Sequence, residues 1–127
     1  MANELILIVE DNDKNLKLVR DVLQHQGYQT IEAGTGEDGV RLARERHPAL
    51  VLMDIQLPGI DGIEALSQLR ADPATRAIPV MAVTASVMAN DRKKIMTAGF
   101  DGYQTKPIRL KDFIAAVRET LDRRAGA

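Results

Sequence analysis

The sequence has no cysteine, which excludes a disulfide framework and any thiolate metal site. It also has almost no excess charge: the formal net charge of −1 gives no reason to expect nucleic acid or an anionic membrane as a partner. No apolar run approaches the roughly 20 residues that span a bilayer. The first residues, MANE, lack the basic region of a signal peptide. Together these absences predict a cytoplasmic location.

Linkers, internal repeats and low-complexity segments are also lacking. A length of 127 residues suits one domain, and 45% hydrophobic residues suffice for a core. We therefore expect a single domain over residues 1–127, with a core from about residue 4 to about residue 122 and a frayed end at 123–127.

Five segments have the composition of β-strands and alternate with helical segments. The first, third and fourth are continuous apolar runs, which are typical of strands buried on both faces. The second and fifth carry polar residues, which indicates the edges of a sheet. The expected strands are residues 5–9, 28–33, 50–54, 80–84 and 102–105.

Side chains that cap helices follow the first three strands. Asn12 or Asp13 can cap the first helix, Thr35 the second and Asp61 the third. The fourth helix is expected over about residues 88–97, before Gly99. The last helix has the clearest apolar stripe, which consists of Leu110, Phe113, Ile114, Val117 and Leu121.

Strict alternation of strands and helices predicts an α/β fold: a parallel sheet with helices on both faces, connected by right-handed crossovers. With the polar strands at the edges, the expected strand order is 2-1-3-4-5, the flavodoxin-like (βα)5 arrangement. The first and third strands are then neighbours at the topological switch point. Ligands of such sheets bind there, beyond the carboxyl ends of the strands.

Reactive side chains follow four of the strands, so the topology gathers them at that rim. Glu10 and Asp11 follow the first strand, Asp54 ends the third, Thr84 ends the fourth and Lys106 follows the fifth. Each alone has an ordinary explanation, such as a helix cap or a surface charge. Together they indicate a site, because clustered carboxylates raise one another's pKa and a hard cation such as Mg²⁺ relieves the conflict.

This set of groups suits phosphoryl transfer to a carboxylate. Asp54 can attack as the nucleophile and form an aspartyl phosphate. Mg²⁺ and Lys106 can neutralise the phosphoryl charge, and the Thr84 hydroxyl can donate a hydrogen bond to it. The bond between Lys106 and Pro107 is a candidate cis peptide that would aim the lysine inward.

The segments ILIVEDN, LVLMDIQLPGIDG, VMAVTA and YQTKPI resemble the receiver domain of two-component response regulators, whose fold is CheY-like, over essentially the whole chain. The resemblance implies that Asp54 accepts a phosphoryl group from a phosphohistidine of a histidine kinase or a histidine phosphotransfer protein. It implies Mg²⁺, with Mn²⁺ as an alternative. The implied metal ligands are Glu10, Asp11, Asp54 and the backbone carbonyl of Gln56.

The resemblance also implies roles around the phosphoryl group. Thr84 and Tyr103 would be the switch pair, Gln56 and Ser86 would tune the lifetime of the phosphoryl group, and the backbone of Ala85 would contact it. A receiver promotes its own phosphorylation and dephosphorylation, so we expect no independent enzyme substrate.

The chain ends after the fifth helix, so we expect a stand-alone receiver. The segments VEDNDKNLKLVRDVLQHQGYQT and MDIQLPGIDG resemble the DivK type of bacterial cell-cycle regulators, which implies control of kinases and phosphatases through protein contact. The expected readout surface combines the fourth helix, the fifth strand and the fifth helix. Its candidate contacts are Met88, Ala89, Ile95 and Tyr103, although Met88 and Ile95 fit ordinary core packing equally well. On the first helix, Leu16 and Lys17 are candidate contacts for the histidine donor.

A phosphorelay intermediate, which would use the same site, is an open alternative. A small Mg²⁺-dependent aspartyl-phosphate phosphohydrolase is a second alternative that fits less well, because such enzymes normally need a cap over their substrate. Residues 34–39, GTGEDG, match a dinucleotide-binding pattern. Glu37 and Asp38 would lie where a pyrophosphate needs a positive field, so we expect these glycines to serve a turn.

Overall fold

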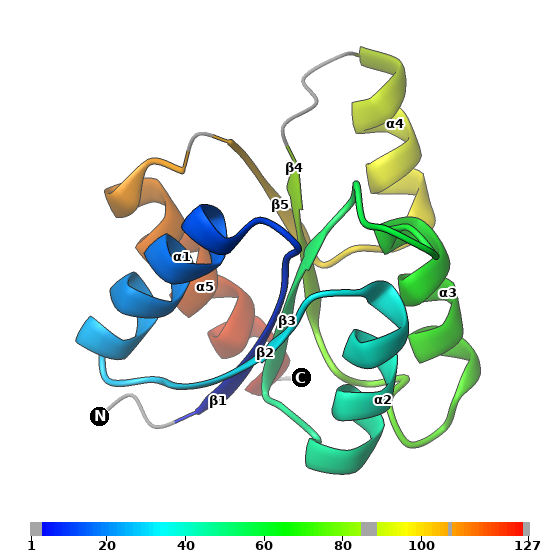
Figure 1. The fold of residues 1–127 in the computed structure, drawn as a ribbon, viewed down its shortest axis with the longest axis horizontal. Helices are drawn as coiled ribbons and strands as arrows, with labels where there is room; N and C mark the ends of the chain where they lie inside the picture. The colour runs from blue at the N-terminus through cyan, green and yellow to red at the C-terminus, as the bar shows by residue number, and fades with distance from the viewer. Residues whose placement is uncertain (1–3, 85–88, 107, 126–127) are drawn as a thin grey trace.

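The computed structural model describes residues 4–84, 89–106 and 108–125 (Figure 1). Strands and helices alternate along this part of the chain, as the sequence predicts. The strands are β1 (Leu5–Val9), β2 (Gln29–Ala33), β3 (Leu50–Asp54), β4 (Val80–Thr84) and β5 (Gly102–Thr105). The helices are α1 (Asp13–His25), α2 (Gly36–Arg46), α3 (Gly62–Ala71), α4 (Ala89–Ala98) and α5 (Leu110–Ala125).

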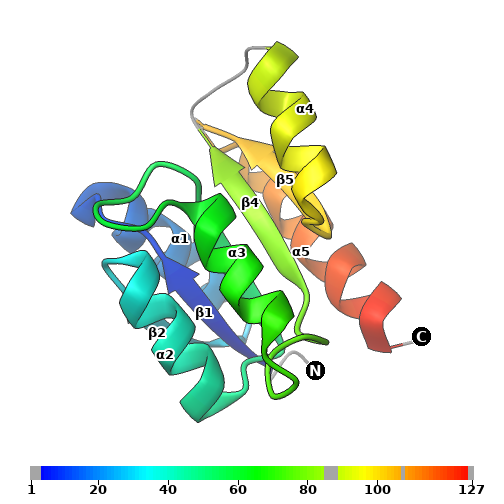
Figure 2. The same cartoon turned by 90° about the vertical axis from the view of Figure 1, so that its right-hand side faces the viewer.

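The five strands form one parallel sheet in the order β2-β1-β3-β4-β5, which confirms the predicted fold class and topology. Helices α1 and α5 cover one face, and α2, α3 and α4 cover the other (Figures 1 and 2). β1 and β3 are neighbours although α1, β2 and α2 separate them in sequence. The predicted switch point therefore lies between these two strands.

Two apolar cores explain why the central strands are continuously hydrophobic. Alternate residues of a strand point to opposite faces of the sheet, so each central strand supplies both cores. The core under α1 and α5 contains Ile6, Ile8, Leu50, Leu52, Met81 and Val83, with Leu23, Phe113 and Val117 of the helices. The core under the other three helices contains Leu7, Val9, Val51, Met53, Val80 and Ala82, with Val40, Leu66 and Ile95 of the helices.

The predicted caps begin three of the helices. The side chain of Asn12 accepts hydrogen bonds from two backbone N–H groups of α1, so Asn12 and not Asp13 is its N-cap. Thr35 caps α2 and Asp61 caps α3 in the same way. Each cap satisfies backbone donors that have no partner within the helix. The caps thus fix where each helix begins after the carboxyl end of a strand.

Two apolar residues lie differently from expectation. Leu110 is 51% exposed, because it is the first residue of α5 and precedes the part of the helix that packs on the sheet. Ile95 is 1% exposed and belongs to the core under α2, α3 and α4, so core packing is confirmed and the alternative of a surface contact is wrong. The direction of a side chain on α4 depends on how that helix sits on the sheet, which its weak apolar periodicity does not determine.

Two of the glycines of residues 34–39, Gly36 and Gly39, lie within α2 and serve close packing rather than the expected turn. A Cβ atom on Gly39 would lie 2.7 Å from Cγ2 of Val9, and one on Gly36 would lie 2.7 Å from Cγ1 of Ile60. Val9 is buried and β-branched, so it cannot rotate away at low cost. Gly39 therefore allows α2 to approach β1 directly beside the end of that strand.

Substituting Gly39 by alanine should lower the free energy of unfolding by about 1–3 kcal/mol, because the added methyl group overpacks the contact with Val9. Urea denaturation measures this change. Gly34→Ala is the matched control, since nothing lies within 4 Å of a Cβ atom at that position. Equal stability of the two variants would contradict the packing role of Gly39.

Candidate functional site

Glu10 and Asp54 come together because β1 and β3 are adjacent and parallel. Val9 pairs with Met53 in the sheet, so the residue that follows each of them lies at the same edge. The backbone N–H of Glu10 donates to the carbonyl of Ala33, which extends the pairing with β2 beyond the end of β1. Both side chains are only 5% exposed. The sheet thus holds two carboxylates in a largely buried position.

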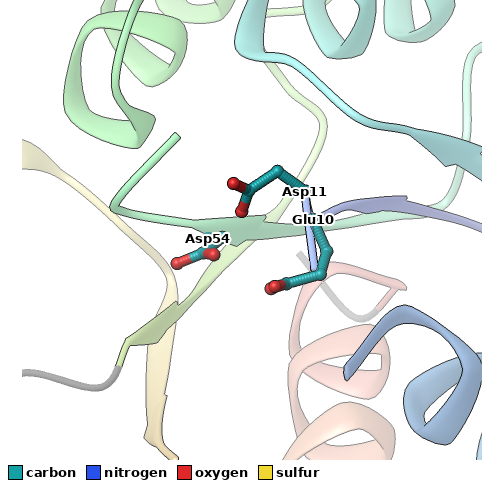
Figure 3. A group of neighbouring side chains, drawn as sticks. All are labelled: Glu10, Asp11 and Asp54. Carbon is teal, nitrogen blue, oxygen red and sulfur yellow. The ribbon is translucent and has the colours of Figure 1, made fainter. Parts of the chain in front are cut away.

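Asp11 adds a third, exposed carboxylate to this edge. One oxygen from each of Glu10, Asp11 and Asp54 lies within 4.8 Å of the others. Figure 3 shows the three side chains extending from the ends of β1 and β3 toward one another. The predicted acidic residues are therefore gathered in one cluster, and one of its members faces solvent.

Lys106 provides a cation to the two buried carboxylates. Its Nζ atom lies 2.9 Å from Oε2 of Glu10 and 3.1 Å from Oδ2 of Asp54. Its backbone N–H donates to the carbonyl of Thr84 at 2.8 Å, so pairing of β5 with β4 continues through this residue. The pairing of β5 with β4 and the carboxylates at the ends of β1 and β3 thus determine where the ammonium group lies.

Lys106 only partly compensates the buried negative charge. Burial raises the pKa of Asp54 to about 6, and the nearby Glu10 carboxylate adds to the rise, while Lys106 opposes it. Burial lowers the pKa of Lys106, but its contacts with Glu10 and Asp54 outweigh this effect and the pKa is raised overall. Asp54 is therefore ionised at neutral pH at a cost in free energy, and Lys106 stays protonated.

Hydrogen bonds from nearby backbone and side-chain groups orient the two buried acids. Oδ1 of Asp54 accepts from the backbone N–H of Gln56 at 3.2 Å. Oε1 of Glu10 accepts from the backbone N–H of Asn12 at 3.2 Å and from Nδ2 of Asn15 at 3.4 Å. Sequence reasoning missed Asn15. The sequence feature that indicates this contact is the position of Asn15 in the first turn of α1, where a polar side chain can reach back to the end of the preceding strand.

Thr84 and Tyr103 lie on neighbouring strands. Thr84 is 1% exposed at the end of β4 and pairs with Thr105, whereas Tyr103 pairs with Ala82 and is half-buried against the core under α2, α3 and α4.

Four predicted positions lie outside the described residues: Ala85, Ser86, Pro107 and Met88. Ala89 is the first residue of α4.

The two residues of α1 that were predicted to contact a phosphohistidine donor differ in exposure. Leu16 is half-buried and packs against the core under α1 and α5. Lys17 is exposed and forms an ion pair with Asp21 at 2.6 Å. Leu18, the residue after Lys17, is 44% exposed. Lys17 and Leu18 are therefore the more accessible of these residues.

Comparison with known proteins gives the class of protein. Residues 6–118 match the family described as the response regulator receiver domain. The chain belongs to this family, whose members act in two-component signalling.

Within the described residues, no helix combines the length and the apolar character needed to cross a membrane.

Among curated relatives, the chain is similar to the polar-differentiation response regulators DivK. It is 45% identical over 116 residues to DivK of Brucella ovis, which covers 91% of this chain and 94% of the relative. It is 44% identical over 116 residues, with the same coverage, to DivK of Brucella anthropi. The resemblance to the DivK type is thus confirmed.

Solved structures support the same fold. A putative response regulator from Chloroflexus aurantiacus matches with a TM-score of 0.90 and 28% identity, over 94% of this chain and 98% of that chain. The receiver domain of sensor histidine kinase PA1611 from Pseudomonas aeruginosa matches with a TM-score of 0.85 and 32% identity, over 99% and 100% of the two chains. The latter structure has a magnesium ion coordinated in its active-site cleft.

The raised pKa of Asp54 predicts a pH-dependent effect of Asp54→Asn on stability in the absence of metal. The pKa of Asp54 is about 6 in the folded protein, above its ordinary value of 3.8, so wild-type stability falls as the pH rises through this window. The variant lacks the buried charge. It should be more stable than the wild type by about 1–2 kcal/mol at pH 7.5, and the gain should disappear near pH 4.

Urea denaturation in the presence of a chelator, at a series of pH values, measures this difference. Asp61→Asn is the control, because Asp61 is exposed and asparagine is an equally good helix cap. A stability gain that is constant from pH 4 to pH 7.5, or a loss at pH 7.5, would contradict the unfavourable burial of the Asp54 charge.

Proposed function

We propose that this protein is a response regulator that accepts a phosphoryl group on Asp54 from a phosphohistidine of a histidine kinase or a histidine phosphotransfer protein. The observation that carries the proposal is the position of Asp54. It is a buried carboxylate at the end of a central strand, 3.1 Å from the ammonium of Lys106 and clustered with two further acids.

In the reaction, an Asp54 carboxylate oxygen forms a bond to phosphorus as the bond from phosphorus to the imidazole nitrogen breaks. The imidazole leaves with the electron pair of that bond, and Asp54 becomes an acyl phosphate. Such transfers depend mainly on positioning and on neutralising charge. Lys106 is already fixed beside Asp54 for this purpose, and the Thr84 hydroxyl at the end of β4 is our candidate donor to the phosphoryl oxygens.

The donor set suits Mg²⁺, which prefers carboxylate, carbonyl and water oxygens. Glu10, Asp11 and Asp54 would hold the ion with the backbone carbonyl of Gln56, and Mn²⁺ has similar preferences. When bound, the ion would supply positive charge to the phosphoryl oxygens. The raised pKa of Asp54 is consistent with the fit, because burial and the neighbouring Glu10 both disfavour the ionised carboxylate and Lys106 does not offset them.

The output is expected from the surface formed by α4, β5 and α5, which would contact a downstream protein. Phosphorylation adds up to about two negative charges at Asp54. A shift of Thr84 toward them would act directly on β5, since Thr84 pairs with Thr105 and its carbonyl accepts from Lys106. Tyr103 would follow by turning inward. Gln56 and Ser86 would tune the lifetime of the phosphoryl group, and the backbone of Ala85 would contact it.

Similarity to DivK suggests a role in controlling kinases of the cell cycle or of cell division, in the cytoplasm and through protein contact. The donor would approach the exposed start of α1, where Lys17 and Leu18 are accessible. A phosphorelay intermediate would perform the same first step and then pass the phosphoryl group to another histidine.

Asp54→Asn should abolish labelling by a radiolabelled, autophosphorylated histidine kinase, because the amide is not a nucleophile. Transfer from the kinase to the purified protein in MgCl₂ measures this loss. The control is again Asp61→Asn, which changes another acid near the same edge and should retain labelling. Undiminished labelling of the Asp54 variant would refute the assignment.

MgCl₂ should raise the melting temperature of the wild type. At a concentration about tenfold above the dissociation constant, the gain is roughly 1.4 kcal/mol, or a few degrees for a domain of this size. Asp11→Asn should reduce the shift strongly, whereas Asp13→Asn, which changes an exposed acid two residues away, should preserve it. Equal increases of the melting temperature with MgCl₂ in both variants would show that the ion binds elsewhere.

A further inference from the structure

Glu10 is the most fully hydrogen-bonded member of the acidic cluster. Its two carboxylate oxygens have different partners. Oε1 accepts from the Asn12 backbone and from Nδ2 of Asn15, and Oε2 accepts from Lys106. One oxygen thereby contacts the start of α1, and the other contacts the ammonium group that also contacts Asp54.

The first turn of α1 makes this arrangement rigid. The Asn12 side chain accepts from the backbone N–H groups of Lys14 at 3.0 Å and Asn15 at 3.1 Å. The same Asn12 donates its own backbone N–H to Glu10. The Asn15 backbone is therefore fixed by the cap, and its side-chain amide, which is only half-exposed, is held toward Glu10.

We infer that Asn15 is a positioning residue for Glu10, and this inference rests on the proposed function. A carboxylate rotates readily about its last side-chain bond, so one backbone donor alone fixes it poorly. The Asn15 amide is a second donor to the same oxygen and restricts that rotation. It keeps Oε2 directed at Lys106 and Asp54, in the orientation that presents a ligand to Mg²⁺. Hydrogen bonds to metal ligands commonly contribute to affinity in this way.

Removal of the Asn15 amide should weaken Mg²⁺ binding about tenfold, the low end of the usual effect of such partners. Asn15→Ala removes the donor, and Asn15→Leu removes it while keeping the bulk of the side chain. Phosphorylation by acetyl phosphate should then need about tenfold more MgCl₂ to reach half its maximum rate. The maximum rate at saturating MgCl₂ should change little, since Asp54 and Lys106 are intact.

The matched control is Gln24→Ala, which removes another side-chain amide hydrogen bond of α1, from Gln24 to Oγ1 of Thr30 at 2.9 Å. It should leave Mg²⁺ affinity unchanged. Mg²⁺ dissociation constants from NMR shift titrations, with melting temperatures in chelator, are measured for all four proteins. A purely structural role for Asn15 would lower the melting temperature in chelator without changing the dissociation constant.

The results separate this inference from the proposed function. A weaker Mg²⁺ affinity in both Asn15 variants, with Gln24→Ala matching the wild type, supports the positioning role. Wild-type affinity in either Asn15 variant overturns that role and leaves the proposed function intact. Absence of Mg²⁺ binding by the wild type itself would overturn the metal site and, with it, the role of Asn15.

Discussion

The contact of one ammonium group with two buried carboxylates is the interaction on which the site depends. Glu10 and Asp54 are each 5% exposed and lie at the ends of adjacent strands, so their charges would repel strongly without a cation. Lys106 reaches both from the far side of β4, at 2.9 Å and 3.1 Å. Burial of these strands on both faces is what keeps the three groups at such short distances.

The compensation is incomplete, and this is consistent with a site that binds charge. Two acids share one ammonium group, and the third acid, Asp11, is exposed beside them. Burial and the neighbouring Glu10 carboxylate raise the pKa of Asp54, and Lys106 does not offset them. A divalent cation would relieve this repulsion, which gives the folded protein a physical reason to bind Mg²⁺. It also means that the carboxylate expected to accept the phosphoryl group is held in an environment that destabilises its ionised form.

Local chemistry made most of the fold predictable from sequence. The continuous apolar runs predicted the central strands, and the polar character of the edge strands predicted the strand order. Capping residues such as Asn12 and Asp61 predicted where the helices begin. The strand ends then located Glu10, Asp54 and Lys106. Features that depend on how a helix sits on the sheet were missed or left open: the reach of Asn15 to Glu10 and the exposure of Leu110 were missed, and the burial of Ile95 was one of two open alternatives. No local pattern determines those contacts, because they join segments through tertiary packing.

The central claim is that Asp54 carries the phosphoryl group, and chemical mapping of the acyl phosphate tests it most directly. The protein is incubated with a phosphorylated histidine kinase and MgCl₂, then treated with borohydride, which reduces an aspartyl phosphate to homoserine. Peptide mass spectrometry should find homoserine at position 54, dependent on the phosphorylated donor. Homoserine at another aspartate, or phosphate retained on His25 or His47, would contradict the account.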